Sequence, residues 1–228
     1  MRNTAIGTEQ RESVAERGYI VVASGLDSQV LGELGNLLDT RYPGERNLLD
    51  VPMIGLLARS DAIRDLAERV LGPDCFAVRG ILFNKVEGAN WKVSWHQDCV
   101  IAVAGRKNIP DWGPWSIKAG VHHVRPNSDL MSRMLAIRIH LDECEADNGP
   151  LRVIPCSHKH GFLSDAQIQE WPKNAAVTCA ASRGDAILMR PLLLHSSPPA
   201  KVPSSRRVVH LEFAADELPT GVEWRDRV

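Results

Sequence analysis

The 228-residue chain carries 27 Lys and Arg against 28 Asp and Glu, which gives a formal net charge of -1 and a sequence pI of about 6.7. This balance lacks the basic field on which nucleic-acid binding depends, so we expect no nucleic-acid partner. No run approaches the roughly 18 apolar residues of a membrane span, and the N-terminus lacks the apolar core of a secretion signal. We therefore expect a cytoplasmic protein without membrane contact, folded as a single domain over residues 1–228.

The cysteines are scattered and odd in number, and none forms a Cys-x-x-Cys pair. They are Cys75, Cys99, Cys144, Cys156 and Cys179. This pattern argues against a disulfide framework and against a structural zinc site, so we expect free thiols.

Residues 1–75 are predicted to be mostly helical, apart from a short β-type run at 19–23. One helix is expected after Asp27, a candidate N-cap, and a second from Ser60 to a stop at Gly72. The first carries an apolar stripe made of Val30, Leu31, Leu34, Leu37 and Leu38. Since such a stripe needs a flat partner, we expect these helices to cover one face of a sheet.

From residue 76 to 214 the pattern changes to short β-like runs separated by Gly, Pro, Asn and Asp. The candidate strands are 76–86, 92–103, 117–124, 134–142, 150–154, 176–180, 185–190 and 206–214. Eight strands is the number in a jelly roll. We therefore predict a mainly β fold with flanking helices (α+β): a cupin-like double-stranded β-helix with the N-terminal helices on one sheet. Residues 164–171 are expected to form a short surface helix, and 215–228 a C-terminal tail.

The stretch Trp95-His96-Gln97-Asp98 contains a candidate metal site. On a strand, His96 and Asp98 leave the same face, and imidazole with carboxylate suits a divalent metal such as iron. The pair alone is weak support, because chance predicts about one His-x-acid pair in this composition. The chain has two more, at His140 and His210.

A late histidine completes the pattern. The run from Gly184-Asp185 ends at His195, and Arg206 follows eleven residues later. A proline-rich turn containing Pro198, Pro199 and Pro203 would bring the strand of Arg206 back beside His195. His96, Asp98 and His195 would then form a facial triad with half of an octahedral iron left open, and Arg206 would bind a carboxylate bidentately.

These residues resemble the phytanoyl-CoA dioxygenase family of Fe(II)- and 2-oxoglutarate-dependent oxygenases over about residues 76–214. The matching blocks are His96-Gln97-Asp98, residues 147–158, and residues 184–197 followed by Arg206. The resemblance implies iron ligands at His96, Asp98 and His195, and a contact from Arg206 to the distal carboxylate of 2-oxoglutarate. It further implies co-substrate contacts from Ser197, Gln97, Arg138 and Ile81.

The chain departs from the family pattern at two places. Cys156 replaces a glycine common in relatives, and Arg138 stands where relatives can carry an aromatic residue beside the co-substrate. Arg138 and His140 share a strand face, so either an extra cation enters the pocket or this face meets solvent. Asp98 is retained, whereas halogenating relatives lack this carboxylate, so hydroxylation or a related oxidation is preferred.

By this resemblance, O2 and 2-oxoglutarate are consumed, succinate and CO2 are released, and a small molecule is oxidised. Trp112 and Trp115, in the long loop 104–116, are candidate substrate-pocket residues. Lys118, Arg125, Arg138 and Arg190 suggest an anionic substrate, although they would serve equally as surface charges. Two alternatives stay open: a cupin-like metalloenzyme that does not use 2-oxoglutarate, and a non-catalytic ligand-binding jelly roll. Monomer and homodimer are both open.

Overall fold

The computed structural model of the protein describes residues 2–38, 44–85, 90–201 and 206–228. The helices are α1 (Arg2–Glu16), α2 (Ser28–Leu37), α3 (Pro52–Arg59), α4 (Asp61–Leu71), α5 (Ser128–Arg133) and α6 (Asp165–Glu170), with 3-10 turns at Leu48–Asp50 and Ser157–His160. Within the described ranges, no helix is both long and apolar enough to span a membrane.

The strands form three antiparallel sheets. The six-stranded sheet has the order β1 (Tyr19–Ala23), β11 (Asp185–Met189), β8 (Leu135–His140), β13 (Arg206–Ala214), β3 (Phe76–Lys85), β2 (Gly44–Arg46). The four-stranded sheet has the order β10 (Val177–Cys179), β9 (Leu151–Val153), β12 (His195–Ser197), β4 (Val93–His96). The three-stranded sheet has the order β5 (Ile101–Val103), β7 (Val121–Val124), β6 (Trp115–Lys118). This mainly β jelly-roll architecture confirms the predicted fold class.

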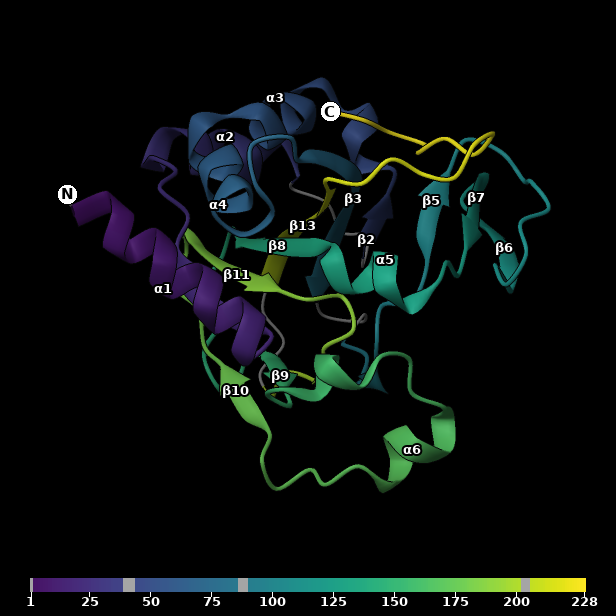
Figure 1. The fold of residues 1–228 in the computed structure, drawn as a ribbon. Helices are drawn as coiled ribbons and strands as arrows, with labels where there is room; N and C mark the ends of the chain where they lie inside the picture. The colour runs from purple at the N-terminus through teal and green to yellow at the C-terminus, as the bar shows by residue number, and fades with distance from the viewer. Residues whose placement is uncertain (1, 39–43, 86–89, 202–205) are drawn as a thin grey trace.

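Helices α2, α3 and α4 cover the outer face of the six-stranded sheet (Figure 1). The alternation along β13 explains why. Val209, Leu211 and Phe213 point outward into one core with Leu34 of α2, whereas Arg206, Val208, His210 and Glu212 point inward. One face of the sheet is therefore apolar and covered by helices, and the other is lined with polar groups.

The predicted helix ends are confirmed. The Asp27 side chain accepts from the Val30 N–H at 2.8 Å, and α4 stops at Gly72, whose φ is 93°. Ser164 caps α6 in a capping box with Gln167.

Two predicted strands were wrong in extent. The run 92–103 is divided into β4 and β5, because the chain leaves the sheet after His96. The run 117–124 is a hairpin whose turn residues Ala119 and Gly120 have φ values of 48° and 77°. The sequence patterns missed β2, α5 and β12, which are too short to show a period.

Helix α2 offers a matched pair of leucines. Leu34 is 1% exposed and Leu37 is 46% exposed. We expect Leu34→Ala to lower the free energy of unfolding by about 2–5 kcal/mol, because it opens a cavity between helix and sheet. Leu37→Ala should stay within about 0.5 kcal/mol of wild type in urea denaturation. Equal losses at both positions would contradict the packing described.

Candidate metal centre and its cavity

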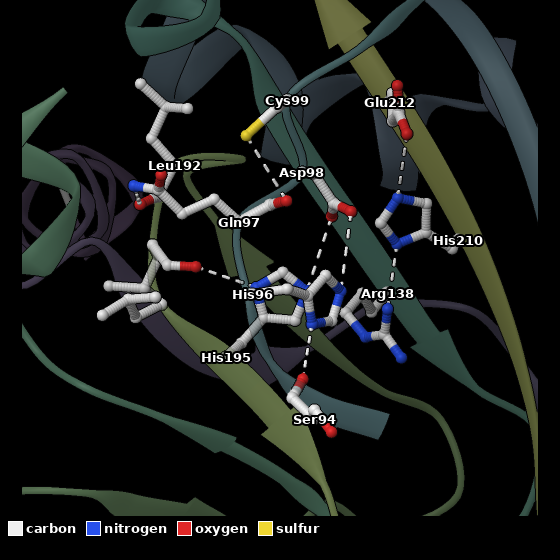
Figure 2. A network of polar contacts seen from close by, with 12 residues as sticks. Ser94, His96, Gln97, Asp98, Cys99, Arg138, Leu192, His195, His210 and Glu212 are labelled. Atoms are coloured by element: carbon white, nitrogen blue, oxygen red, sulfur yellow. Dashed lines mark hydrogen bonds and ion pairs between the residues drawn. The ribbon is translucent and has the colours of Figure 1, made fainter. Parts of the chain in front are cut away.

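His96 and His195 face each other across two paired strands. They are directly opposite in the antiparallel register of β4 and β12, with ring centroids 4.1 Å apart. Asp98 lies just beyond β4, where its N–H donates to the Pro191 carbonyl at 2.9 Å. Its carboxylate oxygens lie 3.6 Å from His195 Nε2 and 3.9 Å from His96 Nε2 (Figure 2).

Backbone carbonyls set the orientation of both imidazoles. His96 Nδ1 lies 2.8 Å from the Ser94 carbonyl, and His195 Nδ1 lies 2.8 Å from the Leu193 carbonyl. Because a carbonyl only accepts, each Nδ1 carries the proton and each Nε2 offers a lone pair toward Asp98. This is the arrangement of a metal-ligating histidine.

The charge state of the cluster suits a cation. Burial, together with the nearby His96, lowers the pKa of His195 to about 3. Desolvation acts to raise the pKa of Asp98, but His195 and His96 outweigh it and hold that pKa below its usual value. At neutral pH, His195 is neutral and Asp98 is ionised. Two imidazoles and one carboxylate on one side of a site fit a non-haem iron with open positions.

The structure brings the three predicted ligands together, and their atoms lie within 4.8 Å of one another. Among the described residues this is the one such group of three or more potential ligands. Two details of the prediction were wrong. Asp98 reaches the site from a turn after β4 and not from the strand, and His195 opens β12 in the other sheet and does not end β11.

A cavity of about 70 Å³ opens beside the triad between the two main sheets. Its apolar wall includes Phe83, Trp91, Val93 and Leu151, and its polar wall includes Lys85, Arg138, Ser197 and Arg206. Arg206 was expected to lie on a strand beside His195. It faces His195 from the opposite sheet, because β13 pairs with β3 and β8. Pro203, in the expected turn, lies outside the described residues.

Arg206 of β13 and Lys85 of β3 lie directly opposite each other in the strand register, at one end of this cavity. Arg206 is 3% exposed, donates through Nη1 to the Gly149 carbonyl, and has no protein partner at its buried Nε. Lys85 donates to Ser197 Oγ at 2.8 Å and to the Pro198 carbonyl, and burial, with Arg206, lowers its pKa to about 8. A desolvated guanidinium with an unpartnered donor fits a carboxylate ligand.

Lys85 was missed by the sequence analysis. Its only signal was that a lysine ends the apolar run Phe76–Lys85, and a lysine at that point is ordinarily solvated. Ser197, predicted as a co-substrate contact, lines the cavity and donates to the Gly149 carbonyl at 2.8 Å. Arg138 also lines it at 7% exposure, so its strand face does not meet solvent.

Several predicted site residues lie elsewhere. The Gln97 amide donates to the Leu192 carbonyl (Figure 2) and to the Gly161 carbonyl, and it accepts from the Leu163 N–H. It therefore holds loops together and does not face a ligand. Trp112 and Trp115 pack against the core under the three-stranded sheet, and Arg190 donates to the Met134 carbonyl. Ile81 lies on the inner face opposite His210, but lines a neighbouring cavity.

The family model for phytanoyl-CoA dioxygenase matches residues 22–208, and the chain belongs to this family. No curated protein matches the chain in sequence. Solved structures with a similar fold include three that are distant in sequence. SnoN, the non-heme alpha-ketoglutarate-dependent epimerase of nogalamycin biosynthesis, is 17% identical with a TM-score of 0.69, over 98% of this chain and 89% of its own.

EctD from S. alaskensis, solved with 2-oxoglutarate and 5-hydroxyectoine, is 21% identical with a TM-score of 0.67, over 91% of this chain and 75% of its own. HygX from Streptomyces hygroscopicus, solved with nickel, 2-oxoglutarate and hygromycin B, is 14% identical with a TM-score of 0.65, over 93% of this chain and 87% of its own. At this level of identity the likeness concerns the fold.

Metal binding by the triad can be measured directly. In an anaerobic Fe(II) titration we expect one equivalent to bind. His195→Ala should weaken metal binding by about 100-fold or more, because loss of a residue that only hydrogen-bonds to a metal ligand already lowers metal affinity by about 10- to 100-fold. His160→Ala is the matched control, since His160 is exposed and its ring meets the Trp171 ring edge to face. Unchanged affinity in His195→Ala would contradict the assigned ligands.

Proposed function

We propose that this protein is an Fe(II)- and 2-oxoglutarate-dependent dioxygenase that hydroxylates or otherwise oxidises a small molecule, with release of succinate and CO2. The observation that carries the proposal is that one cavity has a two-histidine, one-carboxylate triad at one end and a buried arginine at the other. Family membership supports it. So do the 2-oxoglutarate in the EctD structure and the nickel and 2-oxoglutarate in the HygX structure.

When bound, iron and 2-oxoglutarate supply the oxidising chemistry with O2. The chain supplies ligands and orientation. His96 and His195 present Nε2 with no proton to displace, and Asp98 contributes the negative charge. Arg206 holds the distal carboxylate of the dicarboxylate, while Lys85 and Ser197 stand beside it. The apolar wall of the cavity limits access of water to the reacting groups.

Asp98 supports hydroxylation or a related oxidation over halogenation. Its carboxylate lies beside the two imidazoles and would supply the third protein ligand to the metal, which is the position that a halide would need.

Succinate release from 2-oxoglutarate, with and without candidate substrates, tests the proposal. Arg206→Met should lower it about 10- to 100-fold, since a hydrogen-bonded ion pair is lost. Arg152→Met is the control, because Arg152 stands on β9 next to β12 but turns toward the Trp95 ring, 5.6 Å away. Metal binding without succinate release would favour a cupin-like metalloenzyme, and absence of metal binding would favour a non-catalytic jelly roll.

We further propose that the substrate carries an anionic group. Arg46, Arg79 and Lys118 lie near one another, and Arg79 and Lys118 also lie near Asp98. Burial lowers the pKa of Lys118, and Arg79 and Arg46 lower it further, as expected where cations lie close together. A hydrogen bond connects the residues that follow two of these cations: Asn47 Nδ2, next to Arg46, donates to the carbonyl of Ala119, next to Lys118, at 3.2 Å.

The space for such a substrate lies next to the metal cavity. A second cavity of about 320 Å³ is lined by Arg46 and Ile81, and shares Phe83 and Trp91 with the cavity of the triad. Two of the cations expected from the sequence do not contribute. Arg125 stacks on Phe162 at 3.8 Å, and Arg190 is turned to the Met134 carbonyl.

A screen of metabolites for stimulated succinate release tests the substrate class. We expect the stimulating compounds to carry a carboxylate or phosphate, and Lys118→Gln and Arg46→Gln to raise their KM about 10-fold with uncoupled succinate release unchanged. Lys107→Gln, an exposed lysine in the preceding loop, should have no effect. Stimulation by neutral compounds alone would contradict this part of the proposal.

A further inference from the structure

Arg138 projects into the cavity from the middle of the six-stranded sheet. It lies on β8, where Ala136, Arg138 and His140 face inward while Leu135, Ile137 and Ile139 face the helices. Its side chain is 7% exposed and lines the same cavity as His195, Asp98 and Arg206. The guanidinium also lies over the Phe83 ring, 5.0 Å from the centroid. A fully charged group is thus held beside the metal ligands.

A relay of hydrogen bonds across three adjacent strands fixes this guanidinium. Arg138 Nη1 lies 3.1 Å from His210 Nδ1, and His210 Nε2 lies 3.3 Å from Glu212 Oε1 (Figure 2). Arg79 Nη1 lies 3.0 Å from the same carboxylate oxygen. Because a guanidinium only donates and a carboxylate only accepts, Nδ1 of His210 accepts and Nε2 carries the proton. With this pattern His210 accepts from Arg138 as a neutral ring and supplies no counter-charge to the guanidinium.

Each of the two arginines in the cavity has a buried N–H group without a hydrogen-bond acceptor. Arg138 Nε and Arg206 Nε are both buried without a protein partner, and no carboxylate of the described residues lies within ion-pair distance of Arg138. A buried charged donor without an acceptor is costly, and native proteins keep one mainly where a ligand completes it. Burial, with Arg206, lowers the pKa of Arg138 to about 10, so it is cationic at neutral pH. Among the described residues, Asp98 is the one carboxylate that lines this cavity, and the unpartnered Nε atoms of both arginines leave donors for further anionic groups.

We propose that Arg138 is a second carboxylate-binding residue, which holds the carboxylate next to the oxo group of 2-oxoglutarate while Arg206 holds the distal one. The two ends differ in their surroundings. Arg206 lies opposite Lys85 in the strand register and donates to Gly149. Arg138 lies close enough to the metal ligands to lower the pKa of His195, and Asp98 in turn acts to raise the pKa of Arg138. Arg138 therefore belongs to the metal end. The inference rests on the proposed function and deepens it.

On this view, His210, Glu212 and Arg79 are positioning residues. They touch neither the co-substrate nor the metal, and they act by holding Arg138 at a fixed place on the sheet. Because these contacts hold the Arg138 side chain in place before a ligand binds, less side-chain freedom is lost when the carboxylate is bound.

Calorimetric binding to the anaerobic Fe(II)-loaded protein tests the inference with two ligands. 2-Oxoglutarate has both carboxylates, and 2-oxopentanoate has only the one next to its oxo group. Arg138→Met should weaken both ligands by the same factor, about 10- to 100-fold. Arg206→Met should weaken 2-oxoglutarate by a similar factor and leave 2-oxopentanoate unchanged. Arg138→Lys, which keeps a cation without the planar fork, should give an intermediate loss, and Arg152→Met none.

Other outcomes overturn the inference. Equal affinities in Arg138→Met and wild type would remove Arg138 from the co-substrate site. Loss for 2-oxoglutarate alone in Arg138→Met would place Arg138 at the distal carboxylate. Loss of Fe(II) binding together with both ligands in Arg138→Met and Arg138→Lys would make its role structural. Absence of 2-oxoglutarate binding by the wild-type protein would instead overturn the proposed function itself.

Discussion

The direct opposition of His96 and His195 across β4 and β12 is the contact on which the whole site depends. It places two Nε2 atoms beside the Asp98 carboxylate, and carbonyls of the same two chain segments fix both rings. A shift of either strand by one residue would turn one imidazole to the other face. The register of a small four-stranded sheet thus determines whether a metal can be bound.

The six-stranded sheet supplies the complementary half. Its outer face is apolar and packs under α2, α3 and α4, which frees its inner face for charge. Arg79, Arg138, Arg206 and Lys85 lie on that face with Glu212, and only Arg79 has a carboxylate partner in the ion pairs of the described residues. Such an excess of buried positive charge is stable only if anions enter the cavity. A metal ligand set on one sheet facing cations on the other describes a site for a metal-chelating dicarboxylate.

The helix on the sheet and the candidate metal ligands could be predicted from the sequence, because both depend on the spacing of residues along the chain. The stripe around Leu34 predicted the helix on the sheet, and the order of His96, Asp98, His195 and Arg206 predicted the ligand set. What failed depends on where the chain crosses between sheets. His195 ends an apolar run in sequence, yet Pro191 and the residues after it carry the chain into the other sheet. Lys85 and Gln97 were misjudged because burial and hydrogen-bond partners leave no periodic signal.

The central claim is that the triad and Arg206 together form one site for iron and 2-oxoglutarate. The most direct measurement is the visible absorption of the anaerobic Fe(II)-loaded protein during titration with 2-oxoglutarate. The account predicts a charge-transfer band of an iron-chelated 2-oxo acid that saturates at one equivalent and is absent in His195→Ala. Stoichiometric iron binding with no such band at saturating 2-oxoglutarate would contradict it.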